Sequence, residues 1–211
     1  MDIVVDNNRA EREVPVSLRY ALLALLSVEP MTGYDLFKHF ESSVGYVWHA
    51  PDSQIYPELR RMEADGLLEG EDIPWGPRGR KRQYHVTAAG REAFRTWANS
   101  PLDYPRERDP VHLRAAYLEW AEPAAARAQM LAHLEHYTAR RDQWRRKVEE
   151  IDGGTSPILN RRLATVPQEE RARVIAFKRF TYEGLLGRAE QEISWARSGL
   201  KLLDSLYPER A

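Results

Sequence analysis

The 211-residue sequence contains no cysteine. Neither a disulfide framework nor a thiolate zinc site can therefore form. The sequence also lacks any apolar run close to the roughly 18 residues that a membrane span needs. Its first residues, MDIVVDNNRAERE, are too acidic and too polar for a signal peptide. These absences lead us to expect a protein of a reducing compartment, the cytoplasm.

A strong charge of either sign is absent too. The formal net charge is −1 and the isoelectric point is about 6.6, so the whole molecule has no long-range attraction for polyanions. Any nucleic-acid-binding surface must therefore be local. One such cluster stands in the stretch WGPRGRKRQ, where Arg78, Arg80, Lys81 and Arg82 fall within five residues.

No motif of an enzyme is present: the sequence has no nucleophile motif, phosphate-binding loop or paired acidic signature. His133 and His136 are three residues apart on an expected helix and could share a metal ion. Because no third ligand is placed beside them, surface or interface histidines are the favoured interpretation. We expect no enzymatic activity, no metal and no cofactor.

The first hundred residues predict a series of short elements. Residues 1–14 have no apolar period and are expected to be a flexible arm. A helix capped by Ser17 follows, and Pro30 ends it. Thr32 opens a second helix, which ends near Gly45. The residues of this second helix expected to pack inward are Tyr34, Leu36, Phe37 and Phe40.

The stretch DSQIYPELRRMEADGLL predicts a third helix, capped by Asp52 or Ser53 and ended by Gly66. Pro57 is expected in its first turn, where few N–H groups have helical partners. Apolar residues at helical spacing form one face of this helix: Ile55, Leu59 and Met62. On a helical wheel the opposite face carries Gln54, Pro57, Glu58, Arg61 and Asp65, with Ser53 and Arg60 at its sides.

Beyond Gly66 the period becomes that of strands. The runs LLEGEDI and RQYHVT flank WGPRGRK and predict a hairpin with a basic tip, with Tyr84 and Val86 facing the core. Thr87 then caps a fourth helix, which Pro101 closes. Three helices, a hairpin and a helix make a winged helix-turn-helix over residues 15–100.

The second half predicts a mostly α-helical protein with two domains. Residues 101–109 are a linker, and residues 110–211 are helical apart from the break GGTSPILNRRLATVP. The last helix shows an unbroken alternation of spacings of four and three, which needs a partner helix. We expect it to form a homodimer through Tyr182, Leu186, Ala189, Ile193, Ala196, Leu200 and Leu203, with Tyr207 completing the seam. Recruitment of another protein by the same seam remains an alternative.

The chain resembles the PadR family of bacterial transcriptional regulators, in the branch with a long helical C-terminal domain. The matching stretches are LRYALLALLSVEPMTGYDL, WHAPDSQIYPELRRMEADGLL and RKRQYHVTAAGREAFRTW, with a looser match at DPVHLRAAYLEW and the final helix. The resemblance implies a dimer that binds double-stranded operator DNA through the third helix and the wing. It also implies release by a small-molecule effector in many members.

The expected DNA-binding residues lie on the third helix and the wing. Gln can bond adenine, Arg can bond guanine and Ser can bond phosphate, whereas an ordinary solvated helix face is the alternative. For Tyr56 the resemblance implies a contact to the DNA backbone, and simple packing is equally favoured. Glu58 could accept from cytosine or hold an arginine. The full set is Ser53, Gln54, Tyr56, Pro57, Arg60, Arg61, Arg78, Arg80, Lys81 and Arg82.

Four tryptophans on expected helices are candidates for contact with a planar ligand, although core or interface positions are more usual for such residues: Trp97, Trp120, Trp144 and Trp195. The sequence thus predicts a sequence-specific DNA-binding transcriptional regulator, a repressor, that acts as a homodimer on a near-palindromic operator. The alternative is a helical adaptor that recruits proteins and whose winged helix does not bind DNA.

Overall fold

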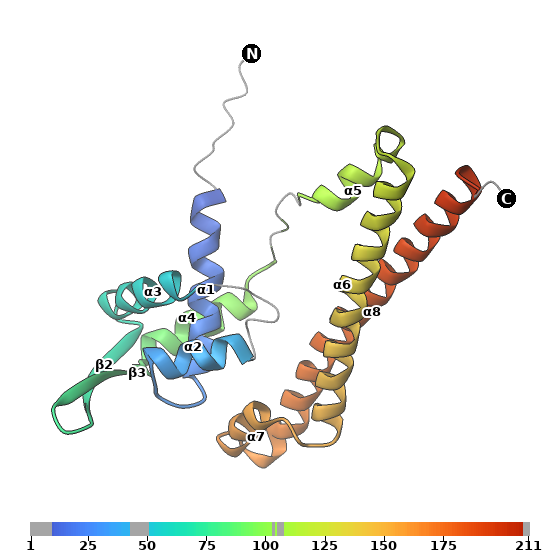
Figure 1. Cartoon of the computed structure of the whole chain (residues 1–211). Coiled ribbons are helices and arrows are strands. Elements are labelled where there is room, and N and C mark those ends of the chain that lie inside the picture. The colour runs from blue at the N-terminus through green and yellow to red at the C-terminus, as the bar shows by residue number, and fades with distance from the viewer. Residues whose placement is uncertain (1–9, 43–50, 103, 105–107, 209–211) are drawn as a thin grey trace. The chain divides into compact units, whose positions relative to one another are not determined.

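The chain divides into two compact units, residues 1–103 and 104–211, each of which is described by itself. The computed structural model describes residues 10–42, 51–102, 104 and 108–208 (Figure 1). The elements of the first unit are α1 (Ala10–Leu26), β1 (Met31–Thr32), α2 (Gly33–Ser42), α3 (Asp52–Ala64), β2 (Leu68–Trp75), β3 (Gly79–Val86) and α4 (Ala88–Asn99). This order confirms the winged helix-turn-helix.

A single apolar core holds the first unit together. Its buried members come from α1, α2, α3 and the small sheet, and most of them lie at the helical spacings that the sequence shows: Leu18, Leu22, Leu23, Leu25, Leu26, Leu36, Phe40, Ile55, Leu59, Met62, Leu68 and Tyr84. Burial of one such Leu or Ile side chain contributes about 1.5–3 kcal/mol. The packing of this core therefore determines which side of α3 faces solvent.

The end of α3 determines where the wing begins. The N–H groups of Gly66 and Leu67 donate to the carbonyls of Glu63 and Met62, at 3.0 and 2.9 Å. Gly66 has φ +72, a left-handed conformation that glycine adopts without steric cost. The chain therefore turns sharply at Gly66, as expected, and enters β2.

The wing is an antiparallel hairpin in which Leu68 pairs with Val86 and Trp75 pairs with Gly79. A short strand that the sequence did not indicate, β1, adds to the other side of β3, giving the sheet order β1-β3-β2. Tyr84 is buried, as expected. The hydroxyl of Thr87 accepts a hydrogen bond from the Gly90 N–H and so caps α4, which confirms that prediction.

Several local expectations were wrong. Helix α1 begins at Ala10, so residues 10–14 are helical and Ser17 lies inside the helix instead of capping it. Pro51 is the N-cap of α3, with no side-chain cap, so Pro57 falls in the second turn. Tyr34 is exposed instead of packed inward. The predictions for residues 1–9 and for Gly45 lie outside the described residues.

The second unit is an antiparallel helical hairpin. Its elements are α5 (Pro110–Ala115), the 3-10 helix η2 (Leu118–Trp120), α6 (Pro123–Asp152), α7 (Pro157–Ala164) and α8 (Gln168–Leu206). Arg127 near the start of α6 pairs with Asp204 near the end of α8, and Arg179 pairs with Asp152 at 3.2 Å at the other end. The expected break contains a helix of its own, α7, which follows Gly154 at φ +65.

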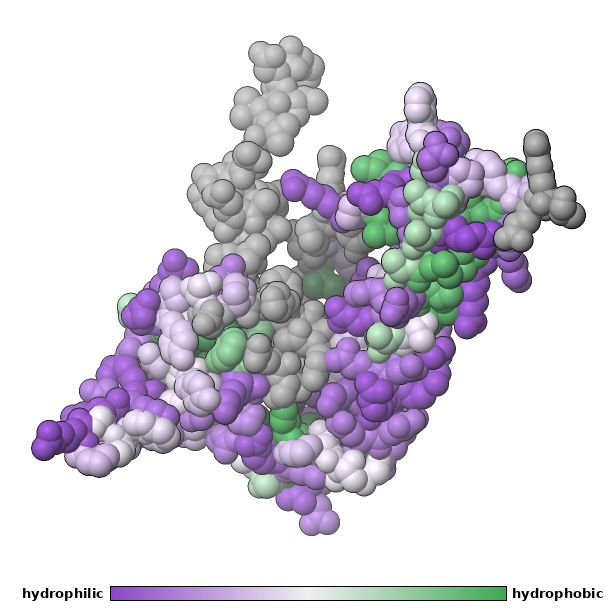
Figure 2. Space-filling view, in the orientation of Figure 1, coloured by the Kyte–Doolittle hydropathy of each residue, from purple (hydrophilic) through white to green (hydrophobic). Residues whose placement is uncertain are grey.

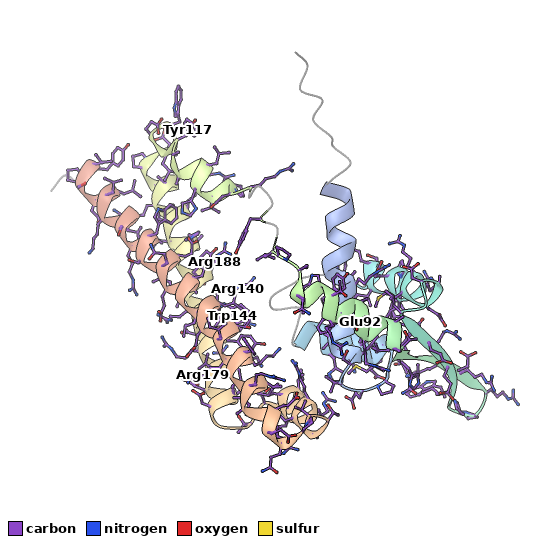
Figure 3. All side chains as sticks on the ribbon, turned by 180° about the vertical axis from the view of Figure 1, so that it is seen from behind. Glu92, Tyr117, Arg140, Trp144, Arg179 and Arg188 are labelled. Atoms are coloured by element: carbon purple, nitrogen blue, oxygen red, sulfur yellow. The ribbon has the colours of Figure 1, made fainter. Side chains whose placement is uncertain are left out.

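Helices α6 and α8 are held together by side chains along their full length. Trp144 and Tyr182 meet with ring centroids 5.9 Å apart. Figure 3 places Arg140, Trp144, Arg179 and Arg188 along this hairpin and Tyr117 at its end beside α5. Among the described helices, none is both long and apolar enough to span a membrane.

Candidate nucleic-acid interface

Helix α3 exposes a polar face to solvent because its apolar residues are buried in the core. Ser53, Gln54, Arg60 and Arg61 are exposed, and Tyr56 is partly exposed. The side chains of Gln54 and Arg60 make no hydrogen bond or ion pair with the other described residues. Their donors and acceptors are free to meet an external partner, and these residue types bond base edges and phosphates.

The position of Glu58 differs from the expectation that it belongs to the exposed face. Its side chain is only 2% exposed, and Arg19 of α1 donates to it at 2.7 Å. Arg61 lies 3.4 Å from its other oxygen, and Arg19 also reaches Asp65 at 2.8 Å. The helical wheel missed this because a buried carboxylate is accommodated only when a cation from another helix meets it.

This arrangement changes the role of Arg61. Its guanidinium is mostly exposed but is tethered at one nitrogen to Glu58. The expectation that Glu58 holds an arginine is thereby confirmed, and it holds two. Arg61 keeps further N–H donors for an external acceptor, since a guanidinium carries five.

Tyr56 packs against the start of α2. A Cβ atom at Gly33 would lie 2.5 Å from the ring of Tyr56, so only glycine allows this approach. The ring nevertheless remains 39% exposed. Tyr56 is therefore packed against Gly33 and is still accessible beside the polar face of α3.

At the wing, two of the four expected cations lack a carboxylate partner in the described part of the chain, and the other two contact side chains of neighbouring elements. Arg78 and Arg80 are exposed near the tip and have no carboxylate partner among the described residues. Lys81 lies over the ring of Trp75, 2.9 Å from its centroid, and 5.5 Å from the ring centroid of Tyr34 on α2. Lys81 therefore joins the wing to α2 through cation–π contacts.

Arg82 is not a free cation, contrary to the expectation that it contacts DNA. It pairs with Glu63 of α3 and, at 3.1 Å, with Asp72 of β2. The bonded guanidinium lowers the pKa of the Glu63 carboxyl, and the two carboxylates raise the pKa of Arg82. Arg82 thus fastens the base of the wing to the end of α3. The space-filling view shows a hydrophilic wing at the lower left (Figure 2).

Tyr34 was missed as a surface residue in the sequence reasoning. It stands at the start of α2, where Lys38 lies 4.6 Å from its ring centroid. Two lysines from different elements therefore meet one exposed ring. A helical wheel could not reveal the contact between Lys81 and Tyr34, because Lys81 lies in a strand 47 positions later in the chain.

The expected dimerisation seam is occupied within the chain. Tyr182, Ala189, Ile193, Ala196 and Leu203 are buried in the single chain, on the side of α8 that packs on α6. A single chain therefore buries this stripe without a second copy. Helix α6 is the partner helix that the heptad spacing requires, since an antiparallel hairpin satisfies the same pattern.

The four candidate tryptophans have different surroundings within their own units. Trp97 stacks on Tyr20 in the first unit with ring centroids 4.8 Å apart, Trp144 is buried, and Trp120 is exposed. Trp195 lines a largely apolar cavity of about 320 Å³. The other residues around this cavity include Leu118, Met130, Gly199, Leu202, Leu203, Leu206 and Tyr207.

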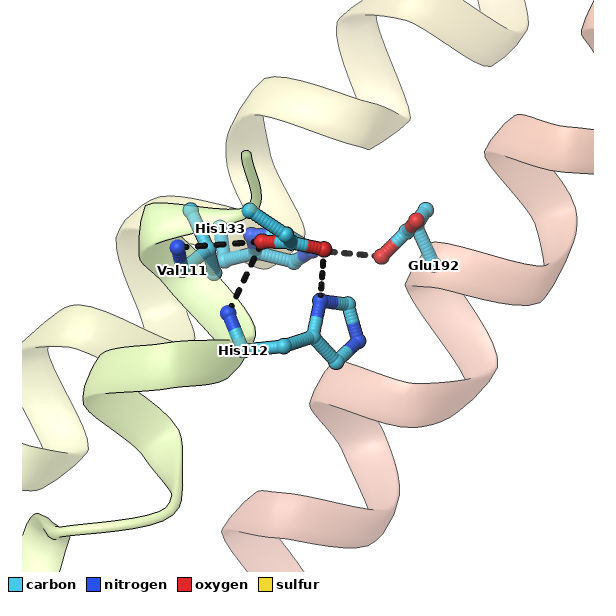
Figure 4. Close-up of polar contacts among 5 residues, drawn as sticks. Val111, His112, His133 and Glu192 are labelled. Atoms are coloured by element: carbon cyan, nitrogen blue, oxygen red, sulfur yellow. Dashed lines mark hydrogen bonds and ion pairs between the residues drawn. The ribbon is translucent and has the colours of Figure 1, made fainter. Parts of the chain in front are cut away.

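A histidine cluster lies beside Trp195. Asp109 caps α5 by accepting from the N–H groups of Val111 and His112, and its second oxygen is 2.7 Å from His112 Nδ1 (Figure 4). These bonds lower the pKa of Asp109, mainly through the backbone N–H of His112. His133 bonds Glu192 at 3.1 Å. In the described part of the chain, no group of three potential metal ligands occurs.

Comparison with known proteins relates the first unit to transcriptional regulators. The model of the transcriptional regulator PadR-like family matches residues 22–96. The negative transcriptional regulator PadR of Bacillus subtilis is 30% identical over 102 residues, which are 48% of this chain and 56% of that protein. A probable transcriptional regulator of Mycobacterium tuberculosis is 32% identical over 91 residues, 43% of this chain and 48% of that protein. These matches span about half the length of the curated relatives.

Solved structures resemble nearly the whole chain. Bacillus subtilis PadR in complex with operator DNA has a TM-score of 0.68 at 24% identity, covering 89% of this chain and 99% of that one. Its complex with p-coumaric acid has a TM-score of 0.66 at 22% identity, covering 89% and 95%. The Vibrio cholerae virulence activator AphA has a TM-score of 0.62 at 27% identity, covering 90% and 99%. The fold is thus that of PadR-like regulators in both units.

Proposed function

We propose that the protein is a sequence-specific DNA-binding repressor, because the model of the PadR-like family of transcriptional regulators matches residues 22–96. The observation that carries this proposal is the face formed by α3 and the wing, where Gln54, Arg60, Arg78 and Arg80 are exposed together on one rigid unit. A helix for the major groove and a basic hairpin beside it are the two parts that such a module needs. Repression is supported by the name of the Bacillus subtilis relative, a negative regulator.

The roles within this face follow from how rigidly each residue is held. Gln54 and Arg61 are fixed by α3 and can meet base edges, so they are assigned to sequence reading. Ser53 and Arg60 flank them and suit the DNA backbone. Arg78 and Arg80 lie near a turn and suit phosphates or a narrow minor groove, whose negative potential attracts arginine. Tyr56 and Pro57 would fill the space against the DNA backbone.

Lys81 and Arg82 serve the site indirectly in this proposal. Arg82 ties the wing to Glu63 at the end of α3, and Lys81 ties it to Tyr34 at the start of α2. The two cations therefore hold the wing at a set angle to the recognition helix. This preorganisation lowers the ordering cost of binding.

The protein would act as a homodimer on a near-palindromic operator. A two-fold dimer presents two copies of α3, and their spacing sets half-sites about one helical turn, roughly 34 Å, or a multiple of it apart. Release by a small aromatic or planar ligand is supported by the p-coumaric acid complex of Bacillus subtilis PadR. In this chain the cavity beside Trp195 has the size and apolar lining for such a ligand.

The test is selection of bound fragments from the organism's own genomic DNA by the purified protein. We expect enrichment of a near-palindromic sequence, and then release of that DNA by members of a library of small aromatic acids. Failure to enrich any sequence would contradict the proposal and favour the protein-recruiting adaptor. The double variant Arg78→Ala with Arg80→Ala serves as the control. It removes the exposed cations of the wing and leaves the core intact, so a loss of DNA binding in this variant is not a loss of folding.

A further inference from the structure

Four cationic side chains line one hollow between α6 and α8. Arg141 and Arg145 come from α6, and Arg197 and Lys201 come from α8. The hollow has a volume of about 340 Å³ and contains one carboxylate, that of Glu190. Four cations and one carboxylate leave a net charge of +3 there, in a chain whose formal net charge is −1. We call it the basic hollow. A concave surface lined by one sign of charge concentrates ions of the opposite sign.

Ion pairs within the chain leave most of this charge unmatched. Arg145 lies 3.7 Å from Glu190, which is longer than a hydrogen bond, and both side chains are half-exposed. The side chains of Arg197 and Lys201 make no hydrogen bond or ion pair with any other residue that the structure describes. The two cations of α8 are therefore free to meet an anion from outside the chain.

Arg141 occupies a position of α6 where an apolar residue would be expected. It stands four residues after Tyr137 and three before the buried Trp144, at the spacing of the side of α6 that packs on α8. Its side chain is 23% exposed, and in the described part of the chain it pairs only with the adjacent Asp142, at 2.8 Å. Desolvation of a guanidinium costs free energy that one partly exposed pair offsets incompletely. A further acceptor in the basic hollow would account for an arginine at this position.

The cations also form like-charge pairs on both helices. Arg141 and Arg145 are four residues apart on α6, and Arg197 and Lys201 are four residues apart on α8. Residues at this spacing are neighbours on a helix surface, where like charges destabilise the helix. Because both pairs line the same hollow, they also repel each other. An anion between the two helices would replace these repulsions by attractions to a common partner.

The donors of the basic hollow favour a phosphate over a carboxylate. Ser194 and Ser198 line it beside the cations, and the Ser198 hydroxyl donates to the carbonyl of Ser194 at 3.0 Å. The Ser194 hydroxyl has no hydrogen-bond partner among the described residues, so it can donate to a ligand. A phosphate ester carries about two charges and three acceptor oxygens that point in different directions. Arginines on two helices can therefore bind one phosphate together, whereas a carboxylate offers only two oxygens in one plane.

We propose that the basic hollow binds a small phosphorylated compound between Arg141 and Arg145 of α6 and Arg197 and Lys201 of α8. Its volume of about 340 Å³ is within the range of small-molecule sites. The site is separate from the cavity beside Trp195, because the two share no described lining residue. It goes beyond the proposed function and does not depend on DNA binding.

The first test is calorimetric titration of the full chain with inorganic pyrophosphate at low ionic strength, where charges are weakly screened. We expect saturable binding, which Arg141→Gln combined with Arg197→Gln should weaken by about tenfold or more. Arg146→Gln combined with Arg173→Gln removes the same charge from exposed arginines outside the basic hollow and should change the affinity by less than about twofold. No binding by the wild type, or equal losses in the two double variants, would overturn the proposal.

Other anions test which chemistry the basic hollow recognises. Citrate has a charge comparable to that of pyrophosphate but offers only carboxylates, so we expect it to bind more weakly. Equal affinities for citrate and pyrophosphate would overturn the assignment of phosphate. ADP is titrated beside them. Tighter binding of ADP than of pyrophosphate would support an esterified diphosphate as the ligand, and weaker binding would support the free anion.

The second test measures the unfolding temperature and keeps the proposal testable if the double variant folds poorly. Arg197→Gln removes the repulsion from Lys201, so it should raise the unfolding temperature in phosphate-free buffer. Pyrophosphate should raise the unfolding temperature of the wild type, because it binds the folded state, and should raise that of Arg197→Gln less. A lower unfolding temperature of Arg197→Gln together with an unchanged response to pyrophosphate would assign Arg197 to folding alone and overturn the proposal.

Duplex DNA of random sequence separates a small ligand from a nucleic-acid backbone. Because the cations line a hollow, we expect Arg141→Gln combined with Arg197→Gln to leave the affinity for this DNA unchanged. A loss as large as that caused by Arg78→Ala with Arg80→Ala would assign the cations to DNA and overturn the proposal. Pyrophosphate binding by a wild type that enriches no DNA sequence would instead support the basic hollow and contradict the proposed function.

Discussion

The guanidinium of Arg19 neutralises a carboxylate that α3 buries almost completely. Glu58 is 2% exposed in its side chain, whereas that of Arg19 is 26% exposed. The two partners are therefore unequal: an unpaired Arg19 could turn towards water, but an unpaired Glu58 could not. The cost of breaking the pair depends on which residue is removed.

We predict that Arg19→Ala destabilises the protein by about 3 kcal/mol, because the buried Glu58 then keeps only its longer contact with Arg61, at 3.4 Å. Glu58→Gln should cost about 1 kcal/mol, since the amide oxygen still accepts from Arg19. Urea denaturation of the two variants measures the difference. Arg95→Ala, in the exposed pair with Glu92, is the control and should change stability by less than about 0.5 kcal/mol. Equal costs for Arg19→Ala and Glu58→Gln would contradict this reasoning.

Variants of Gln54 and Arg80 test which residues of the proposed DNA-binding face contact bases and which contact phosphates. Gln54→Ala should cost on the order of 1–3 kcal/mol for the operator and little for random DNA, because base contacts carry specificity. Arg80→Ala should weaken both and make the salt dependence shallower by about one phosphate contact, a slope change near 0.9. Titration of operator and scrambled duplexes at several salt concentrations distinguishes the two effects. The reverse pattern would show that the roles are exchanged.

The pair between Glu63 and Arg82 makes the base of the wing dependent on pH. Arg82 lowers the pKa of Glu63 below its ordinary value of 4.5. The stabilisation is therefore present above that ordinary pKa and is lost as pH falls through the lowered one. The stability difference between the wild type and Glu63→Gln should be constant from pH 7 to pH 5 and should shrink as pH falls below 4.5 and through the lowered pKa of Glu63. Urea denaturation across this range measures it, and a difference that persists at low pH would exclude the ion pair as its cause.

At the scale of elements, the structure depends on how each helix pairs its faces. Helix α3 turns Ile55, Leu59 and Met62 to the core and leaves its polar side to solvent. Helix α8 turns Tyr182, Ile193 and Ala196 to α6 and leaves Phe177 and Phe180 exposed. The wing is held to α3 by Arg82 and to α2 by Lys81.

Gly184 lowers the stability of α8 without a packing reason in the described part of the chain. Gly184→Ala should stabilise the protein by up to about 1 kcal/mol, because alanine favours the helix and its Cβ meets nothing. Thermal unfolding measures the effect. Gly199→Ala is the control and should not stabilise the protein, because its Cβ would lie 2.8 Å from the sulfur of Met130. A lower unfolding temperature for Gly184→Ala would contradict this prediction.

At the scale of the whole molecule, the proposed two-fold dimer would fix the spacing of operator half-sites. Inserting five base pairs between the half-sites rotates one of them by about half a turn, so one copy of α3 would face away from its groove. Affinity should fall towards that of random DNA, whereas a ten-base-pair insertion should restore part of it. Gel-shift titration of the three duplexes measures this. Equal affinities for all three would contradict simultaneous binding of two copies.

The sequence alone predicted the winged helix-turn-helix because local signals marked each element. The Gly66 turn, the alternation around Tyr84 and the Thr87 cap all depend on residues close together in the chain. The long helices of the second unit followed from the spacing of apolar residues in the same way. These features need no knowledge of which elements meet in space.

Tertiary structure decided which polar residues are free and which apolar seam is already filled. Glu58 turned inward because Arg19 of another helix meets it, and Arg82 was neutralised by carboxylates from α3 and β2. The seam of Tyr182 and Ile193 proved to face α6 and not a second copy. A heptad shows that a helix needs a partner, but only the packing shows which helix that is, because both arrangements satisfy the same spacing.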